Sequence, residues 1–163
     1  MPMDQSLLNT HVKLLAFDFL SLSPTADPTV FSRFGKLLSR AEIVGTITSR
    51  DFKPNKFVRF TIDDGTGCVP CILWLNHLRS PYFSRRDPAS VRLIANAATE
   101  FAARIKVGVV ARVRGRITSY RDEVQITVSD VVIEKDPNME VLHWLDCLRL
   151  ARKCYDVDVH KFK

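Results

Sequence analysis

The stretch FVRFTIDDGTGCVPCILWLN, residues 57–76, decides the fold. Its first run alternates strictly between two faces: Phe57, Arg59 and Thr61 against Val58, Phe60 and Ile62. The run after the glycines alternates in the same way, and such patterning on both sides of a glycine-rich break predicts two antiparallel strands joined by a turn. Gly65 and Gly67 allow the positive φ angles of a tight turn, and Asp63 and Asp64 can bond the turn's own backbone. We therefore interpret the two carboxylates as turn residues and not as an acid/base couple.

Composition favours a single intracellular domain with a polyanionic partner. The chain has 163 residues, 46% of them hydrophobic, which suffices for one core over residues 1–163. It contains no apolar run long enough to span a bilayer, and its first ten residues, MPMDQSLLNT, lack the basic region of a secretory signal. Four scattered cysteines do not suggest a disulfide framework, so we expect a reducing compartment and no membrane association. The formal net charge of +6 favours a polyanion as partner.

Positive charge is concentrated in residues 104–121, RIKVGVVARVRGRITSYR, which hold six basic residues and no acid. In an alternating strand, one face carries Arg112, Arg114, Arg116 and Tyr120. The opposite face is apolar or glycine between positions 111 and 117, so it belongs in the core. A ladder of guanidinium groups ending in a tyrosine can follow a phosphate backbone while the ring stacks on a base. Outward strand positions are often charged, and arginines protect edge strands from aggregation; because no acid balances the three arginines, we favour nucleic-acid binding.

Three residues of the quoted stretch extend this candidate site. Phe57 and Arg59 point outward if the alternate positions of their strand are in the core. Trp74 alternates with Cys71 and Leu73, so it also faces outward if those two are buried. An exposed tryptophan on the third strand suits base stacking. Spacing alone leaves open the alternative that Trp74 plugs one end of the core.

The C-x-x-C segment, Cys68 to Cys71, is interpreted as a pair of ordinary thiols. Zinc requires about four ligands, usually from a second such pair, and the chain has none. A redox pair places its first cysteine at a helix N-terminus, whereas both of these lie in a predicted strand. The remaining cysteines and the histidines form no recognisable ligand set: Cys147, Cys154, His11, His77, His143 and His160. We expect no metal and no cofactor.

Other alternating runs predict further strands. The expected strands cover residues 11–22, 41–50, 109–119 and 123–133. The first of them is apolar on both faces, which suggests burial on both. Residues 23–40 contain two prolines and a glycine and are expected to form a connecting segment. Gly45 lies in the middle of its strand, which indicates a bulge or a sharp bend.

Two helices complete the expected fold. Asp87-Pro88 opens an amphipathic helix that ends near Gly108, and Asp136-Pro137 opens a second helix over about 138–155. The order of elements predicts a mainly β protein: a five-stranded OB-fold barrel with an extra N-terminal strand, a helix between strands 3 and 4, and a C-terminal helix. Its core is expected at about 41–135.

The C-terminal helix carries an apolar arc wider than one side of a small barrel requires. Two lines run along it: Val141, Leu145, Leu148 and Arg152, and beside them Trp144, Cys147, Ala151, Cys154 and Tyr155. An apolar surface this broad rarely stays open to water, so we expect it to pack on a partner. The predicted partner-binding residues are Val141, Trp144, Leu145, Leu148, Ala151 and Tyr155. In the alternative, the helix folds back on its own barrel and both lines are core.

Three segments together resemble a known family. AEIVGTI from residue 41, FTIDDGTGCVPCILW from residue 60 and VRGRITSYRDE from residue 113 occur in this order, with a helix between the last two. They are similar to the middle subunit of replication protein A and still more to its telomeric counterpart, the Stn subunit of the CST (Ctc–Stn–Ten) complex. The likeness covers roughly residues 11–155. The short form resembles the plant branch, and Thr118 stands where some relatives have a basic residue.

The resemblance implies a non-enzymatic subunit that binds single-stranded telomeric DNA and protects chromosome ends in the nucleus. It further implies that the C-terminal helix contacts a small Ten-like OB-fold subunit, and that a large Ctc-like subunit completes the complex. Two other functions stay open at this point. One is a general single-stranded DNA-binding subunit like that of replication protein A, and the other is a scaffold whose barrel binds only protein.

Overall fold

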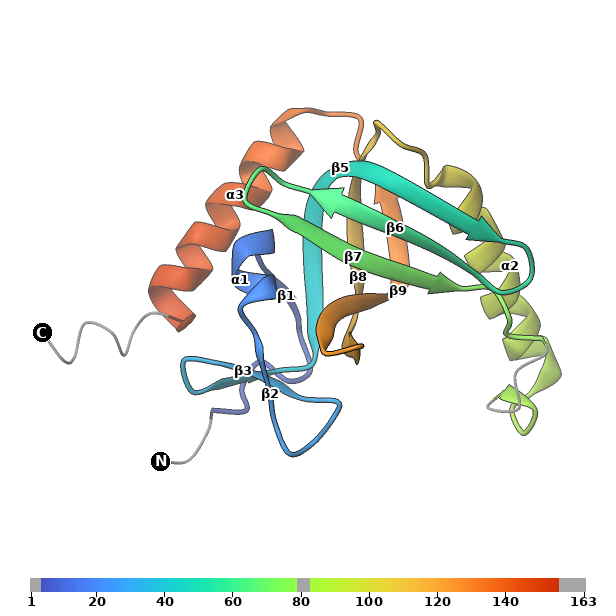
Figure 1. The fold of residues 1–163 in the computed structure, drawn as a ribbon, viewed down its shortest axis with the longest axis horizontal. Coiled ribbons are helices and arrows are strands. Elements are labelled where there is room, and N and C mark those ends of the chain that lie inside the picture. The colour runs from blue at the N-terminus through green and yellow to red at the C-terminus, as the bar shows by residue number, and fades with distance from the viewer. Residues whose placement is uncertain (1–3, 79–82, 156–163) are drawn as a thin grey trace, which may run out of the picture.

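The computed structural model describes residues 4–78 and 83–155 (Figure 1). In chain order its elements are β1 (His11–Lys13), α1 (Ala16–Leu20), β2 (Ser23–Pro24), β3 (Phe31–Arg33), β4 (Lys36–Leu38), β5 (Arg40–Lys53), β6 (Phe57–Asp63), β7 (Cys68–Trp74), α2 (Pro88–Arg104), β8 (Val110–Tyr120), β9 (Glu123–Ile133) and α3 (Asn138–Leu150). A π-helical turn over Ala151–Tyr155 continues α3. No helix in the described ranges is long and apolar enough to cross a membrane.

Five long strands form a sheet that closes on itself. The strand order is β1-β5-β6-β7-β9-β8, and β5 also pairs with β8. The closure depends on β5, whose first half runs antiparallel to β8 and whose second half runs antiparallel to β6, with Thr46 at the change of partner. The junction between β7 and β9 is parallel and short, with pairs at Cys71–Ile126 and Ile72–Thr127.

Two glycines allow the strands to approach closely where the sheet bends. A Cβ atom on Gly45 would lie 2.5 Å from the carbonyl oxygen of Asp63, and one on Gly115 would overlap the carbonyl oxygen of Thr127. The sequence predicts a bulge or bend at Gly45. The irregularity in the ladder lies slightly further on, between Ile47 and Ser49. Glycine is therefore required at both positions because backbone occupies the space of a side chain.

The predicted hairpin is confirmed, with β6 and β7 in continuous antiparallel register. Asp63 accepts a hydrogen bond from the Gly65 amide (2.8 Å), and Asp64 accepts one from the Thr66 amide (2.9 Å), so both carboxylates hold the turn as predicted. Gly65 has a positive φ of 89°. Gly67 does not, which corrects one expectation: its lack of a side chain instead leaves room for Leu20, whose Cδ1 would lie 3.1 Å from an added Cβ.

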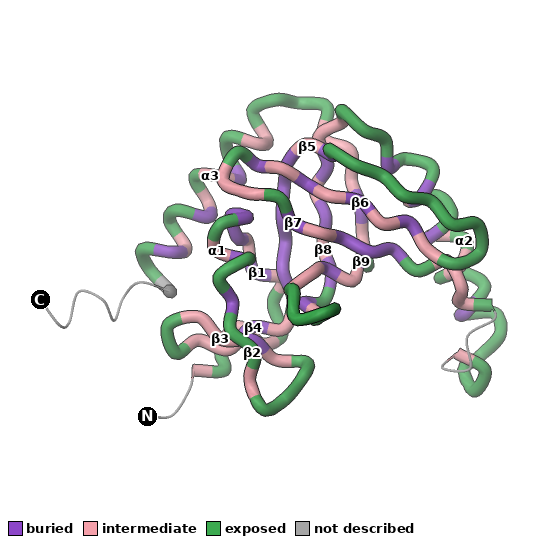
Figure 2. The backbone as a smooth tube through the Cα atoms, viewed as in Figure 1, coloured by how far each residue is buried: buried purple, intermediate pink, exposed green. Residues whose placement is uncertain are grey.

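Buried residues recur at alternate positions along the strands of the closed sheet (Figure 2), and their apolar side chains form its core. The largest of them from β5, β6 and β8 are Ile43, Ile47, Phe60, Ile62 and Ile117. Helix α2 packs on β7 and β9. Its cap is the predicted Asp87, which accepts hydrogen bonds from the Ala89 amide (3.4 Å) and the Ser90 hydroxyl (3.0 Å). The helix begins at Pro88, where a missing N–H is harmless.

The N-terminal strand expected over 11–22 is wrong beyond Lys13. Only three residues pair with β5, in parallel, and the chain then turns into the short helix α1. The hairpin turn causes this change, because Asp64 accepts a hydrogen bond from the Ala16 amide (2.7 Å) and Thr66 accepts one from the Phe17 amide (3.0 Å). These acceptors satisfy amides that open the helix. The apolar pattern on both faces misled the prediction, since Phe17 remains 67% exposed.

Residues 23–40 are also more ordered than the expected connecting segment. β2, β3 and β4 form a small antiparallel sheet beside the closed one. Phe31 of β3 and Leu38 of β4 are buried and join the main core. The small sheet therefore extends the single core of the described chain.

Candidate nucleic-acid interface

Four of the predicted nucleic-acid-binding residues meet on the outer face of the closed sheet. Phe57 and Trp74 make an edge-to-face contact, with ring centroids 6.0 Å apart and planes at 81°. The guanidinium carbon of Arg59 lies 4.9 Å from the centroid of Phe57 and 4.8 Å from that of Tyr120. We call Trp74, Phe57, Arg59 and Tyr120 the stacking row. The row spans β6, β7 and β8, and it presents three aromatic rings and one guanidinium group on one surface.

The register of the hairpin produces one end of this row. Phe57 and Trp74 are paired directly across β6 and β7 at the open end of the hairpin. Alternate positions of β6 are buried, so Phe57 and Arg59 take the outer face as predicted. Trp74 is 39% exposed, which excludes the alternative of a core tryptophan. Its ring is free to offer part of its surface to a ligand.

The β8–β9 turn places Tyr120 at the other end of the row. Arg121 and Asp122 both have positive φ angles, 51° and 64°, as a two-residue type I′ hairpin turn requires. The guanidinium carbon of Arg121 lies 5.1 Å from the Tyr120 ring centroid. A hydrogen bond with Arg59, and next the charge of Arg121, lower the pKa of Tyr120. Neither arginine forms an ion pair within the described residues, and Asp51, the register partner of Arg59, pairs with Lys53 instead (3.9 Å).

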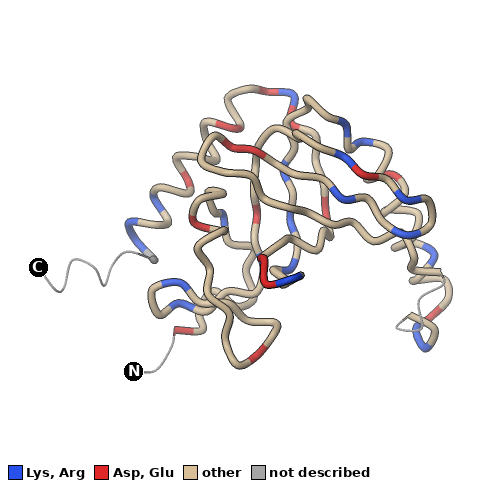
Figure 3. The backbone as a smooth tube through the Cα atoms, in the orientation of Figure 1, with Lys and Arg blue, Asp and Glu red and all other residues tan. Residues whose placement is uncertain are grey.

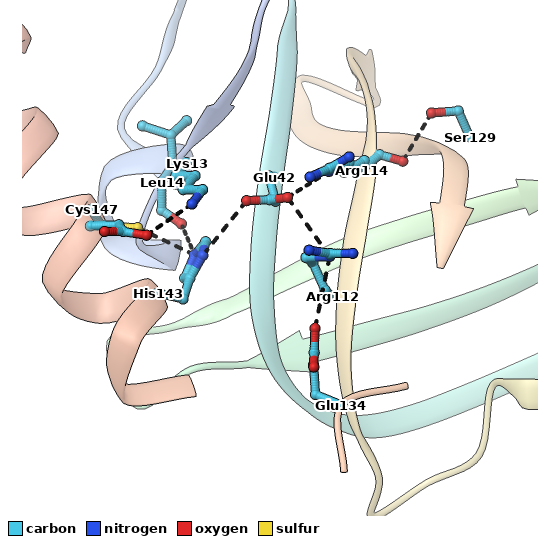
Figure 4. Close-up of polar contacts among 10 residues, drawn as sticks. Lys13, Leu14, Glu42, Arg112, Arg114, Ser129, Glu134, His143 and Cys147 are labelled. Atoms are coloured by element: carbon cyan, nitrogen blue, oxygen red, sulfur yellow. Dashed lines mark hydrogen bonds and ion pairs between the residues drawn. The ribbon is translucent and has the colours of Figure 1, made fainter. Parts of the chain in front are cut away.

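The three arginines on the outer face of β8 differ in whether a carboxylate pairs with them. This corrects the expectation that no acid balances them. Arg114 Nε lies 2.5 Å from Glu42 Oε1, and Arg112 Nε lies 3.9 Å from the same oxygen and 3.8 Å from Glu134 (Figure 4). Glu42 comes from β5 and is buried, and sheet closure sets it opposite Arg114. Arg116 has no ion pair in the part of the chain that is described. It instead lines a groove with Trp74.

The two cysteines of the hairpin differ in environment. Cys68 is exposed, whereas Cys71 is buried, and burial raises the pKa of its thiol. Neither is in a disulfide. Within residues 4–78 and 83–155, no three His, Cys, Asp or Glu side chains are grouped as metal ligands would be. The absence of metal stays a prediction, and one histidine that entered it, His160, lies outside the described residues.

Comparisons with known proteins place this geometry in a family. A family model described as an OB-fold nucleic acid binding domain matches residues 41–134. The CST complex subunit STN1 of Arabidopsis thaliana is 55% identical over 159 residues, which cover 96% of this chain and 99% of that protein. The chain belongs to the STN1 family. Its fold is accordingly a mainly β OB fold with a C-terminal helix.

More distant members and solved structures agree with the STN1 assignment. The human CST complex subunit STN1 is 27% identical over 158 residues, which cover 91% of this chain and 42% of the human protein. A crystal structure of the S. pombe Stn1–Ten1 complex matches with a TM-score of 0.74 at 18% identity, covering 93% of this chain and 98% of the matched one. A replication protein A heterotrimer bound to single-stranded DNA matches with a TM-score of 0.66 at 18% identity, covering 86% and 94%. These structural matches concern the fold.

In this STN1-family chain, the two apolar lines of α3 differ in burial. Val141, Leu145 and Leu148 are exposed, and together with Trp144 they line a shallow apolar hollow. Trp144 also donates a hydrogen bond to the carbonyl of Asp64 (3.2 Å), which ties the helix to the hairpin turn. Ala151 is buried against the core, so its expected place on an open surface is wrong. The side chain of Tyr155 lies outside the described residues.

A buried polar cluster lies beneath α3 and was not predicted from the sequence. His143 Nδ1 lies 3.9 Å from Glu42 Oε2, and His143 Nε2 lies 3.2 Å from the Cys147 sulfur (Figure 4). The order Cys, His, Glu mimics a nucleophile, base and orienting acid. Burial nevertheless closes the thiol to substrate and raises the pKa of Cys147 to about 12. The cluster is therefore structural. Only the (i, i+4) spacing of His143 and Cys147 was visible in the sequence.

Proposed function

We propose that this chain is the STN1-type subunit of a CST-like complex, in which it binds single-stranded telomeric DNA and helps to protect chromosome ends in the nucleus. The stacking row carries this proposal. Aromatic rings stack on bases of any sequence, and unpaired arginines beside them attract the phosphates between those bases. The role is one of binding, without catalysis. The closed sheet acts as the five-stranded OB barrel that holds the row in place.

The charges around the row support a path for the strand. OB folds use this face together with the two loops that flank it. Here Lys53 ends β5, Lys56 lies in the β5–β6 loop, and the β8–β9 turn carries Arg121 (Figure 3). Cations therefore lie beyond both ends of the row. A strand that crosses β6 and β7 would meet positive charge where it enters and where it leaves.

The three arginines of β8 take different roles in this proposal. Arg116 contacts DNA because its guanidinium is not held by a carboxylate of the described chain. Arg112 and Arg114 instead hold Glu42 beneath α3, where the Lys13–Asp146 ion pair (2.8 Å) joins β1 to the same helix. These contacts fix the direction in which α3 presents its outer face.

The outer face of α3 is the proposed site for a small Ten-like OB-fold subunit. Its exposed line of Val141, Leu145 and Leu148 is apolar, and the partly buried Trp144 borders it. Two structural relatives are the S. pombe Stn1–Ten1 complex and a structure of yeast Stn1 and Ten1, and the Arabidopsis relative is a CST complex subunit. We infer the same small partner here, together with a large Ctc-like subunit.

Fluorescence anisotropy of the chain in complex with its small partner tests the function. We expect single-stranded telomeric DNA to bind more tightly than the duplex. Trp74→Ala and Tyr120→Ala should each reduce the binding free energy by about 1–3 kcal/mol, the usual contribution of one stacked base. Phe34→Ala is the matched control, because Phe34 is an exposed ring stacked on Arg33 but lies in the β3–β4 turn, away from the stacking row.

The outcomes separate the alternatives. Unchanged affinity in both stacking variants would contradict the proposal and favour a scaffold that binds only protein. An Arabidopsis thaliana relative, named as a 32 kDa component of replication protein A, is 28% identical over 114 residues, which cover 70% of this chain and 34% of that protein. A general role of that kind would give equal affinity for telomeric and unrelated strands when the whole complex is titrated.

A further inference from the structure

A groove runs beside the stacking row, between α2, the end of β7 and the middle of β9. Its volume is about 710 Å³. Trp74, His77 and Arg116 line one part of it, and Ile94, Ala97 and Phe101 of α2 line another. We propose that this α2 groove receives one unstacked nucleobase, with its phosphate, from the same single strand that crosses the stacking row. The inference rests on the proposed function and extends its site.

The polar part of the groove fits a nucleotide. Arg116 stands on the outer face of β8, opposite Thr127 of β9, and no carboxylate of the described chain pairs with it. His77 Nδ1 is buried and has no hydrogen-bond partner among the described residues. Burial lowers the pKa of His77, so at neutral pH its ring is uncharged and can donate or accept one hydrogen bond. The arginine suits a phosphate, and the imidazole suits a base edge.

The helical part of the groove is apolar. Ile94, Ala97 and Phe101 follow the spacing of one helix face, and Ile94 remains exposed although isoleucine is usually buried. The small side chain of Ala97, in the middle of this wall, leaves space in the groove. A nucleobase has apolar faces and a polar edge, so it matches both parts of the groove. An apolar peptide would leave Arg116 and His77 without partners.

Trp74 connects the groove with the stacking row. The same residue contacts Phe57 and lines the groove. A strand that leaves the row at Trp74 therefore reaches the groove with its next nucleotides. The volume is within the usual range for small-ligand sites, so a purine or a pyrimidine fits. Because OB folds contact about 4–16 nucleotides, the groove adds to the length of strand that is bound.

Filling the groove from α2 tests this inference. Ala97→Phe introduces a ring into the groove, and Ala103→Phe introduces the same ring at an exposed position of the same helix that does not line it. Both variants are assayed in the complex with the small partner, against oligonucleotides of about four and about ten nucleotides. We expect Ala97→Phe to weaken binding of the longer strand roughly tenfold, as for one lost stack, and to leave the shorter one unchanged. Ala103→Phe should change neither.

A second variant tests the same inference if Ala97→Phe does not fold. Arg116→Gln should lower the slope of log affinity against log salt by about 0.7 for the longer strand only, the value for one lost phosphate contact. Wild-type affinity in Ala97→Phe, with its melting temperature kept, would overturn the groove assignment, and so would a loss that does not depend on strand length. In either case Tyr120→Ala, which changes the stacking row but not the groove lining, still decides the proposed function separately.

Discussion

Leu148→Glu, a substitution on the outer face of α3, should prevent binding of the small partner without unfolding the chain. Val141, Leu145 and Leu148 are 60%, 56% and 47% exposed. Full burial of such a side chain contributes about 1.5–3 kcal/mol, so covering the open half of Leu148 contributes roughly 1 kcal/mol and covering all three roughly 3 kcal/mol. Leu148→Ala should therefore weaken partner binding about fivefold. Leu148→Glu should abolish it at micromolar concentration, because it also buries a carboxylate without a partner, which costs several kcal/mol more.

The assay compares partner binding with thermal unfolding of the isolated chain. Leu148→Glu should leave the melting temperature nearly unchanged, since the substituted side chain meets water in the free chain. Cys147→Glu is the matched control one position away: Cys147 is buried, so the same charge should unfold the protein. We also expect the isolated wild-type chain to self-associate. A monodisperse wild-type monomer that Leu148→Glu unfolds would refute the reasoning, because that outcome requires α3 to be covered on both sides.

Three other results follow from the described contacts. Gly115→Ala should lower the melting temperature strongly, because the added Cβ would overlap the carbonyl oxygen of Thr127; a neutral effect would contradict this close approach of β8 and β9. Burial lowers the pKa of His143, against the opposing charge of Glu42, so the unfolded chain binds more protons below about pH 6.5 and stability should fall as the pH drops below that value. Urea titrations at pH 7.5 and 5 should give a smaller difference for His143→Gln than for wild type, and equal differences would refute this source of acid sensitivity. Maleimide should label Cys68 in the native protein but Cys71 only after unfolding, and native mass spectrometry should find no zinc; stoichiometric zinc would contradict the thiol interpretation.

Features that depend on local sequence could be predicted. The alternation around the Asp-Gly turn defines β6 and β7, and it also sends Phe57, Arg59 and Trp74 to one face. The Asp87-Pro88 pair defines the start of α2, since a cap and a proline act within one turn of helix. For the same reason, the positions of Arg112, Arg114 and Arg116 on the outer face of β8 follow from period two alone.

Features that depend on distant contacts could not be predicted in this way. α1 forms because Asp64 and Thr66, almost fifty positions away, accept its first amides, and the apolar run of α1 itself is equally compatible with a strand. Glu42 pairs with Arg114 and approaches Arg112 only because the sheet closes on itself. Likewise, the inward direction of Ala151 depends on how α3 lies against the core, which no periodicity within the helix records.

The fluorescence of Trp74 tests the central claim most directly. The chain has two tryptophans, and the emission that Trp74→Phe removes from the complex with the small partner is that of Trp74. Single-stranded telomeric DNA is titrated into the wild-type and Trp74→Phe complexes, while anisotropy of a labelled strand reports binding. If bases stack on the row, emission from Trp74 should be quenched in proportion to the bound fraction, and duplex DNA should not quench it. Saturating binding of the single strand with unchanged Trp74 emission would contradict the account.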